Sequence, residues 1–383
     1  MKLPRRKKTE RFFKGFFAPV AALLVFFGLS AGVLYRAGEY MPMADIAAKL
    51  EKTGGVFGSS LHSQAFWYKQ EVYKRIKPDI ATLGSSRTLL LRRDHFNAPF
   101  ANLGLMGSID EEMEIAKALF DTHAPKVLLL EAPWWWFHPA PAASKAVKRS
   151  PAVVTPDIAA LMQPVRWLLT GETTFGETLR MLLKPSPSVG VTGVLHDQGY
   201  DAVGSFRYTA SLTGQTENKD KEFTGTIAKM KNGDKAFLGA KHVSPAQWKK
   251  FITLLDYLKS KDIHVVFFVP PVAPAVHALM QKDAAKFAYM QELSGKLEAV
   301  MQKYGFGYFD FHDAAKLGAT DCEFVDGLHG GYIIYDRLLL EIAAADSKVS
   351  VNRALLERES KARRGYASTL KDEIDFLNLG CQR

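Results

Sequence analysis

The chain has 383 residues, of which 47% are hydrophobic and 23% are charged. That length suits one large α/β domain or two smaller ones, and the composition excludes disorder, collagen and a small disulfide scaffold for the chain as a whole. The net charge is +10, but residues 1–14 alone contribute +6 and no second basic run follows, so we expect no nucleic-acid binding.

The basic head, residues 1–14, precedes an uncharged apolar stretch over residues 15–35. At about 1.5 Å per residue, a helix of this stretch is about 30 Å long, which matches a hydrocarbon core. The alternative is a cleaved signal peptide, but the run is longer than a typical signal and no A-x-A site follows. We therefore expect a single-pass anchor in the cytoplasmic (inner) membrane, with the head inside and the rest of the chain periplasmic or extracellular.

The exported part opens with residues 36–75, which we interpret as a helical stalk broken by glycine and serine between residues 54 and 60. A strand over 79–83 then ends abruptly at Gly84-Ser85-Ser86, and a second short strand leads into residues 102–104. Further elements are expected in this order: a helix opened by a capping box at Ser108, a strand over 126–131, a helix over 245–261, a strand over 264–271, a helix over 283–304, a strand over 307–311 and a helix over 332–345.

Strands that alternate with helices indicate an α/β fold with a central parallel sheet covered on both faces. We expect this domain to span residues 76–345, followed by a C-terminal tail over 346–383. Residues 139–240 interrupt the alternation and are rich in proline, with a helical pair near 156–183, so we interpret them as an insertion.

The two cysteines, Cys322 and Cys381, form no CxxC pair. Outside the cytoplasm they could form a disulfide that fixes the tail beside the 326–329 loop, or they could stay as free thiols, and the sequence leaves both open. No HExxH motif or clustered His/Cys spacing occurs, so we expect no metal and no cofactor.

Three residues form a candidate catalytic set: Ser86, His329 and Asp326. A serine nucleophile needs a base within hydrogen-bond reach and an acid that orients the base. Ser86 follows a strand in a tight turn. Asp326 and His329 are three residues apart, so one short loop can carry both the acid and the base. Each piece alone is weak evidence, but together in this order they indicate nucleophilic catalysis.

These residues resemble the conserved blocks of SGNH (GDSL-like) hydrolases. Gly84-Ser85-Ser86 is similar to the first block, the segment from Asn102 to Gly107 to the second, and Asp326-Gly327-Leu328-His329 to the D-x-x-H block. The resemblance implies a three-layer α/β/α fold, with Ser86 as nucleophile, His329 as base and Asp326 as orienter. It also implies an oxyanion held by the N–H groups of Ser86 and Gly107.

The third block departs from the family pattern, because Glu131-Ala132-Pro133 and the aromatic run Trp134, Trp135 and Trp136 stand where the family has G-x-N-D. With the N-terminal anchor, this pattern is similar to DltD-type proteins and to SGNH-like proteins of polysaccharide O-acetylation. That resemblance implies acyl transfer to a cell-envelope polymer, together with a membrane-bound O-acyltransferase (MBOAT) partner.

Four further residues are expected at the substrate. Arg87 could bind an anionic group, or form a surface salt bridge instead. Trp134, Trp135 and Trp136 could stack on sugar rings, or pack under the insertion.

Two other functions remain open. One is an esterase that removes acyl groups from cell-surface glycans, and the other is a non-catalytic scaffold that binds the polymer. The missing oxyanion asparagine counts against the esterase, and the presence of Ser86, Asp326 and His329 together counts against the scaffold.

Overall fold

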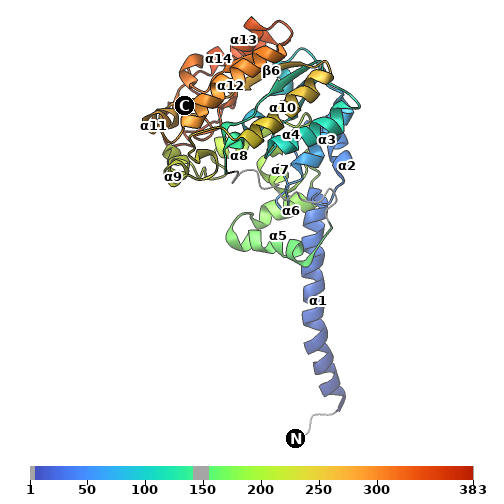
Figure 1. Cartoon of the computed structure of the whole chain (residues 1–383). Coiled ribbons are helices and arrows are strands. Elements are labelled where there is room, and N and C mark those ends of the chain that lie inside the picture. Colours follow the sequence, from blue (N-terminus) through green and yellow to red (C-terminus); the bar gives the residue numbers. More distant parts are fainter. Residues whose placement is uncertain (1–4, 141–154, 383) are drawn as a thin grey trace. The chain divides into compact units, whose positions relative to one another are not determined.

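The computed structural model describes residues 5–140 and 155–382, which fall into two compact units (Figure 1). In the described chain, the first unit holds residues 5–63 and 155–199, and the second holds 64–140 and 200–382. The stretch expected as one insertion, 139–240, is therefore divided between the two units.

The first unit is helical. Its helix α1 (Arg5–Ala37) contains a segment, Gly15–Ala37, that is long and apolar enough to cross a membrane, as expected. The other helices are α2 (Met43–Thr53), α5 (Ile158–Thr170), α6 (Phe175–Leu183) and α7 (Val191–His196). The helical pair expected near 156–183 is thus confirmed as α5 and α6.

The second unit is built on a five-stranded parallel sheet with the order β2-β1-β3-β6-β7. Its strands are β1 (Ile80–Leu83), β2 (Phe100–Leu103), β3 (Val127–Leu130), β6 (His264–Val269) and β7 (Gly307–Asp310). Every residue of β1, β2 and β3 is buried, as the continuous apolar runs predict for a parallel sheet covered on both faces.

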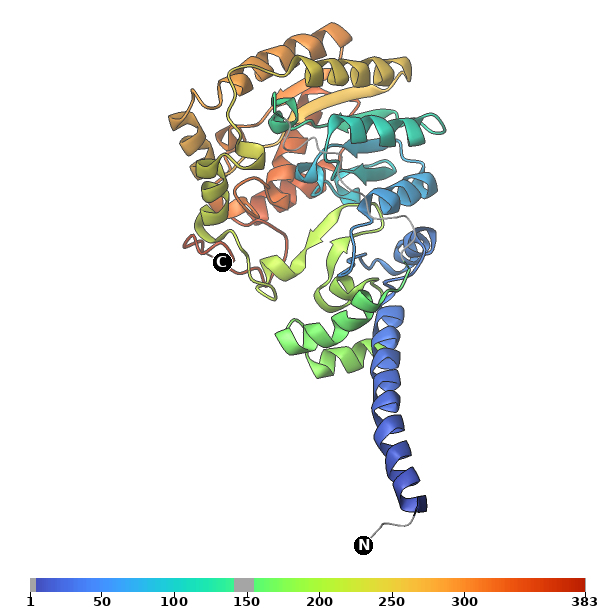
Figure 2. The ribbon, with the colours of Figure 1, turned by 60° about the horizontal axis from the view of Figure 1, so that its bottom comes forward.

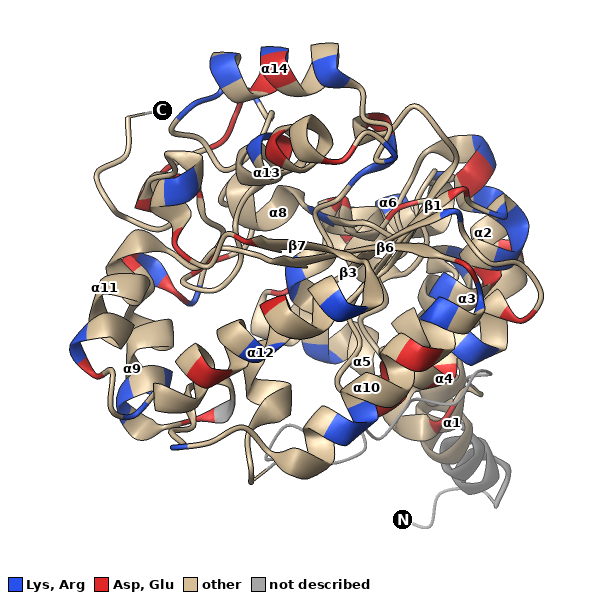
Figure 3. Ribbon diagram, turned by 45° about the horizontal axis from the view of Figure 1, so that its top comes forward, with Lys and Arg blue, Asp and Glu red and all other residues tan. Residues whose placement is uncertain are grey.

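Helices cover both faces of this sheet, with α13 (Tyr332–Ala345) and α14 (Arg353–Ala362) on one side and α10 (Pro245–Ser260) and α12 (Ala288–Tyr304) on the other (Figure 3). The α/β fold with a central parallel sheet is confirmed. The remaining helices of the unit are α3 (Ala65–Ile76), α4 (Ile109–Phe120), α8 (Thr209–Leu212), α9 (Thr224–Asn232) and α11 (Pro274–Lys282).

Capping residues in the sequence predicted where two of these helices begin. Ser108 caps α4 by accepting a hydrogen bond from the Glu111 N–H, and Ser244 caps α10 with Pro245 at the first helical position. The helix expected over 283–304 begins only at Ala288, since residues 283–287 form turns that separate it from α11.

A disulfide joins Cys322 and Cys381, with 5.8 Å between their Cα atoms. This settles the alternative that the sequence left open. Since disulfides persist in oxidising compartments, it indicates that this unit lies outside the cytoplasm.

The short strands β4 (Gln198–Tyr200) and β5 (Phe206–Tyr208) form a separate two-stranded sheet.

Candidate active site

The turn after β1 presents Ser86 at the carboxyl end of the sheet. A 3₁₀ turn (Ser86–Thr88) starts directly after it, capped by the Ser85 hydroxyl, which accepts a hydrogen bond from the Arg87 N–H. Gly84 is required here because a Cβ would lie 2.9 Å from a carboxylate oxygen of Glu131. Ser85 and Arg87 are buried whereas Ser86 is partly exposed, so the turn directs the Ser86 side chain alone toward the surface.

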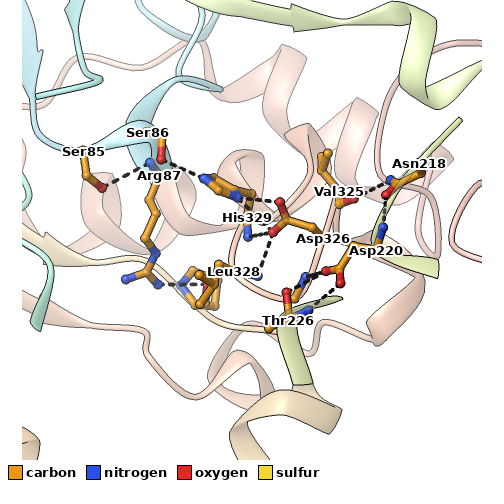
Figure 4. Close-up of polar contacts among 12 residues, drawn as sticks. Ser85, Ser86, Arg87, Asn218, Asp220, Thr226, Val325, Asp326, Leu328 and His329 are labelled. Carbon is orange, nitrogen blue, oxygen red and sulfur yellow. Dashed lines mark hydrogen bonds and ion pairs between the residues drawn. The ribbon is translucent and has the colours of Figure 1, made fainter. Parts of the chain in front are cut away.

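The three candidate catalytic residues form one hydrogen-bonded relay (Figure 4). The Ser86 Oγ lies 2.8 Å from the His329 Nε2. On the other side of the ring, Nδ1 lies 2.9 and 2.8 Å from the two carboxylate oxygens of Asp326. A carboxylate only accepts, so Nδ1 carries the ring proton and Nε2 accepts from the Ser86 hydroxyl. This is the geometry that a general base needs to activate a serine.

The loop that carries the acid and the base is closed by Asp326 itself. Its Oδ1 accepts hydrogen bonds from the backbone N–H groups of Leu328 (2.8 Å) and His329 (2.9 Å). Burial alone would raise the pKa of the Asp326 carboxyl, but the interaction with His329 and these hydrogen bonds outweigh it and hold the pKa below its ordinary value. Asp326 is therefore ionised at neutral pH, as an orienting carboxylate must be.

A second carboxylate, that of Asp220, holds the 326–329 loop through hydrogen bonds. Asp220 accepts hydrogen bonds from the N–H and the hydroxyl of Thr226, both at 2.7 Å, and from the Gly327 N–H at 2.9 Å (Figure 4). A Cβ at Gly327 would lie 2.6 Å from the Thr226 methyl carbon. Asn218 adds a hydrogen bond to the Val325 carbonyl at 3.0 Å. Sequence reasoning missed this support, because Asp220 belongs to no motif.

Glu131 was also missed as a site residue. It is buried at the end of β3, and its Oε2 accepts the Ser85 N–H at 2.7 Å. Burial raises the pKa of this carboxyl, against the opposing effect of Arg87, whose Nη1 lies 4.0 Å from Oε1. Glu131 thus fixes the backbone immediately before the nucleophile.

The loop after β2 is tied to the nucleophile turn by Asn102. Its side-chain amide donates to the carbonyls of Thr88 (2.9 Å) and Leu91 (3.1 Å), and its Oδ1 accepts the Gly104 N–H (2.8 Å). In the same loop Leu105 has a φ of +83°, a strained conformation for a bulky side chain.

Of the two N–H groups expected to bind the oxyanion, one is free in the described part of this structure and the other is already hydrogen-bonded. Within the described residues the Ser86 N–H has no hydrogen-bond acceptor, so it is free to bind an oxyanion. The Gly107 N–H instead donates to the Glu111 Oε2 at 2.7 Å. For Gly107 to serve as a donor, the Glu111 side chain has to release it.

The residues expected to contact substrate lie mostly in the core. Arg87 is 1% exposed, and its guanidinium donates to the carbonyls of Pro270 and Pro271. It also lies over the Trp134 ring, 5.0 Å from the ring centroid.

Trp134 and Trp136 are buried in a second 3₁₀ turn (Trp134–Phe137) rather than on a strand, and only Trp135 is partly exposed. The Trp134 indole N–H donates to the Ala236 carbonyl at 2.7 Å, so its polar end is paired within the core.

Comparison with known proteins adds no family assignment. No protein-family model matches the chain, and a search of the curated proteins finds no match.

Proposed function

We propose that this protein is a membrane-anchored, SGNH-like serine O-acyltransferase component that transfers an acyl group, acetyl or D-alanyl, to a cell-envelope polymer. The observation that carries the proposal is the relay of Ser86, His329 and Asp326, with both hydrogen bonds at 2.8–2.9 Å. The resemblance of the sequence blocks around these residues to the DltD-type group supports acyl transfer as the reaction.

Two transfers make up the proposed reaction. His329 Nε2 takes the proton of Ser86 as Oγ attacks the acyl carbonyl, and the leaving group of the donor departs with that proton. A polymer hydroxyl then gives its proton to His329 and attacks the acyl-serine, and the proton returns to Ser86 Oγ as the ester bond to the enzyme breaks. The Ser86 N–H stabilises the oxyanion in both steps, and Gly107 joins it when released from Glu111.

The location supports a membrane-bound acyl donor. The apolar segment Gly15–Ala37 is long enough to hold the chain in a membrane, and the disulfide indicates an oxidising compartment for the unit that carries Ser86. An acyl group made in the cytoplasm has to cross the membrane to reach this serine. A partner of the MBOAT type would supply that step.

Hydrolysis of cell-surface esters is the second candidate. The side chains of His329 and Asp326 are 21% and 33% exposed, so water can approach the base. An acyltransferase has to exclude water or outcompete it with the polymer hydroxyl. The same relay would therefore serve an esterase if no acceptor is bound.

Intact-protein mass spectrometry of the full chain in detergent, after exposure to an activated acetyl ester, tests the proposal. The proposal expects one acetyl adduct mapped to Ser86, absent from Ser86→Ala and His329→Ala, and lost faster when an envelope polysaccharide is added. Loss at the same rate with and without the polymer would favour the esterase. A folded wild type that gains no adduct would contradict serine catalysis by the isolated chain.

A further inference from the structure

The exposed apolar side chains of this protein are concentrated in the first unit. Outside α1, the described residues include seven large hydrophobic side chains that are exposed, and six of them lie on α5 and α6. They are Ile158, Met162, Leu169, Phe175, Leu179 and Leu183. Soluble surfaces rarely gather apolar groups in this way without a partner.

On each helix these side chains lie along one side. On α6 the exposed positions Phe175, Leu179 and Leu183 are four residues apart, which places them on one side of the helix. On α5, Ile158, Met162 and Leu169 are four and seven residues apart and also share one side, where the exposed Arg166 lies between Met162 and Leu169. Leu169 is 83% exposed and Phe175 is 74% exposed, so the faces point outward rather than into the unit.

The opposite faces of the same helices pack on the end of α1. Trp167 of α5 and Met181 of α6 share a buried cluster with Val33, Leu34 and Ala37 of α1. Figures 1 and 2 both show α5 and α6 beside this end of α1. The hairpin formed by α5 and α6 is therefore attached to the anchor helix itself.

The attachment fixes the depth of the hairpin. A Cβ at Gly32 would lie 3.4 Å from the Leu182 Cδ2, so α6 approaches α1 five residues before the apolar segment ends at Ala37. At about 1.5 Å per residue, that contact lies about 7 to 8 Å inside the end of the segment. Amphipathic helices that lie in a membrane interface are buried about 5–10 Å into the headgroup and acyl boundary.

Polar groups at the same level suit the headgroup region. Arg36, at the end of α1, donates to the Leu182 carbonyl at 3.2 Å and is exposed. Tyr35 is exposed beside it, and Arg180 and Lys184 are exposed at the end of α6. Tyrosine and basic side chains are enriched at the membrane–water interface, where their polar ends reach the headgroups.

From these observations we infer that the α5–α6 hairpin is an interfacial membrane element, whose exposed apolar faces insert among the lipids of the extracytoplasmic leaflet beside α1. A lipid surface is the favoured occupant because the hairpin packs on the end of the apolar segment Gly15–Ala37 and exposes its apolar side chains there. The inference rests on α1 staying in the membrane as part of the proposed function, but not on the acyl-transfer chemistry.

Site-directed nitroxide labelling of the full chain tests this inference. Single variants Leu169→Cys and Leu183→Cys are labelled and reconstituted, without any partner protein, into phosphatidylcholine vesicles. Leu24→Cys in α1 serves as the lipid-exposed control, and Lys52→Cys on the exposed surface of α2 serves as the water-exposed control. Intact mass checks that α1 is retained and that the native disulfide is formed.

The inference expects both hairpin labels to behave like the label at residue 24, colliding with dissolved oxygen and losing collisions with a water-soluble nickel chelate. Water-like behaviour at both positions, matching residue 52 while residue 24 stays lipid-like, would overturn it and leave a protein partner as the occupant. A mature chain that lacks α1 would overturn it as well. Neither readout needs an acyl donor, so a failed acylation assay leaves this result unaffected.

Discussion

The substitution Asp326→Asn isolates the role of the orienting carboxylate. Asp326 accepts the Nδ1–H of His329, shared between its two oxygens at 2.9 and 2.8 Å, and two backbone N–H groups on Oδ1 at 2.8 and 2.9 Å. Asparagine keeps an oxygen at Oδ1 for the backbone donors, but its NH₂ group replaces Oδ2, the closer acceptor of the Nδ1 proton, and presents a donor to Nδ1 instead. The ring therefore takes the other tautomer, and Nε2 presents a proton to Ser86 instead of a lone pair.

The expected loss follows from this change of tautomer. In serine triads of this geometry the same substitution lowers kcat by about 10⁴, which at about 1.36 kcal/mol per factor of ten is about 5 kcal/mol of transition-state stabilisation. The fold should persist, because the side chain keeps its shape and the backbone hydrogen bonds to Oδ1. We expect the free energy of unfolding to fall by about 1–3 kcal/mol, the contribution of a hydrogen bond to a charged group.

The rate at which a fluorophosphonate modifies Ser86, followed by intact mass, measures the effect directly. Asp313→Asn is the matched control, because Asp313 faces a different histidine, His277, at 3.8 Å and caps a turn away from Ser86. It should leave the rate unchanged. A folded Asp326→Asn protein that reacts at the wild-type rate would refute the assignment of Asp326 as the orienter of His329.

Three further predictions concern the support of the site and the stability of the second unit. Gly327→Ala should slow modification of Ser86 by about a hundredfold, because the new Cβ would displace the loop that carries His329. Gly295→Ala in α12 is the control: a Cβ there meets no atom within 4 Å, and the substitution should stabilise the protein by up to about 1 kcal/mol. Replacing Cys322 and Cys381 by serine should lower the free energy of unfolding by about 4 kcal/mol, since the disulfide closes a loop with a sequence separation of 59. Asp336 of α13 is fully buried, with His95 Nε2 at 3.2 Å from its Oδ1, and the stability of wild type relative to Asp336→Asn should decrease from pH 5 to pH 8.

Each of these has a clear contrary result. Equal modification rates for the two glycine variants would show that the loop has room for a Cβ, and equal denaturation midpoints with and without reductant would show that the disulfide contributes no stability. For Asp336, burial raises the pKa to about 7 against the opposing effect of Arg92, while the unfolded value is about 3.9. The folded protein thus keeps a proton that the unfolded chain has lost, and this contribution to stability is full below about pH 4 and lost as the pH rises through about 7. A difference in Tm that stays constant with pH would contradict it.

The sequence was sufficient for the elements whose signals are local. Buried apolar runs predicted the strands of the parallel sheet, and the serines that cap α4 and α10 fixed where those helices begin. The close spacing of Asp326 and His329, and the position of Ser86 after a strand, were enough to predict a relay that the fold brings within hydrogen-bond distance.

The sequence was insufficient where a residue acts through a distant contact. Asp220 reaches Gly327 across 107 positions, and Glu131 reaches Ser85 across 46, so neither spacing resembles a motif. The burial of Arg87 could not be predicted either, because only the fold shows that its guanidinium donates to the carbonyls of Pro270 and Pro271. Burial, rather than residue type, decides such roles.

The order of the sheet has a consequence for how the protein matures. The hydrogen bond between Ser86 and His329 joins positions 243 residues apart, and the strand that carries the serine lies inside a sheet whose edge strand, β7, comes late in the chain. Contacts so distant in sequence form slowly, because the chain entropy of closing the long loop is lost before the contact stabilises the fold. Until residues 326–329 fold against it, the serine turn has no base beside it. The relay therefore forms late in folding, because His329 lies beyond even β7, the last strand of the sheet, in the chain.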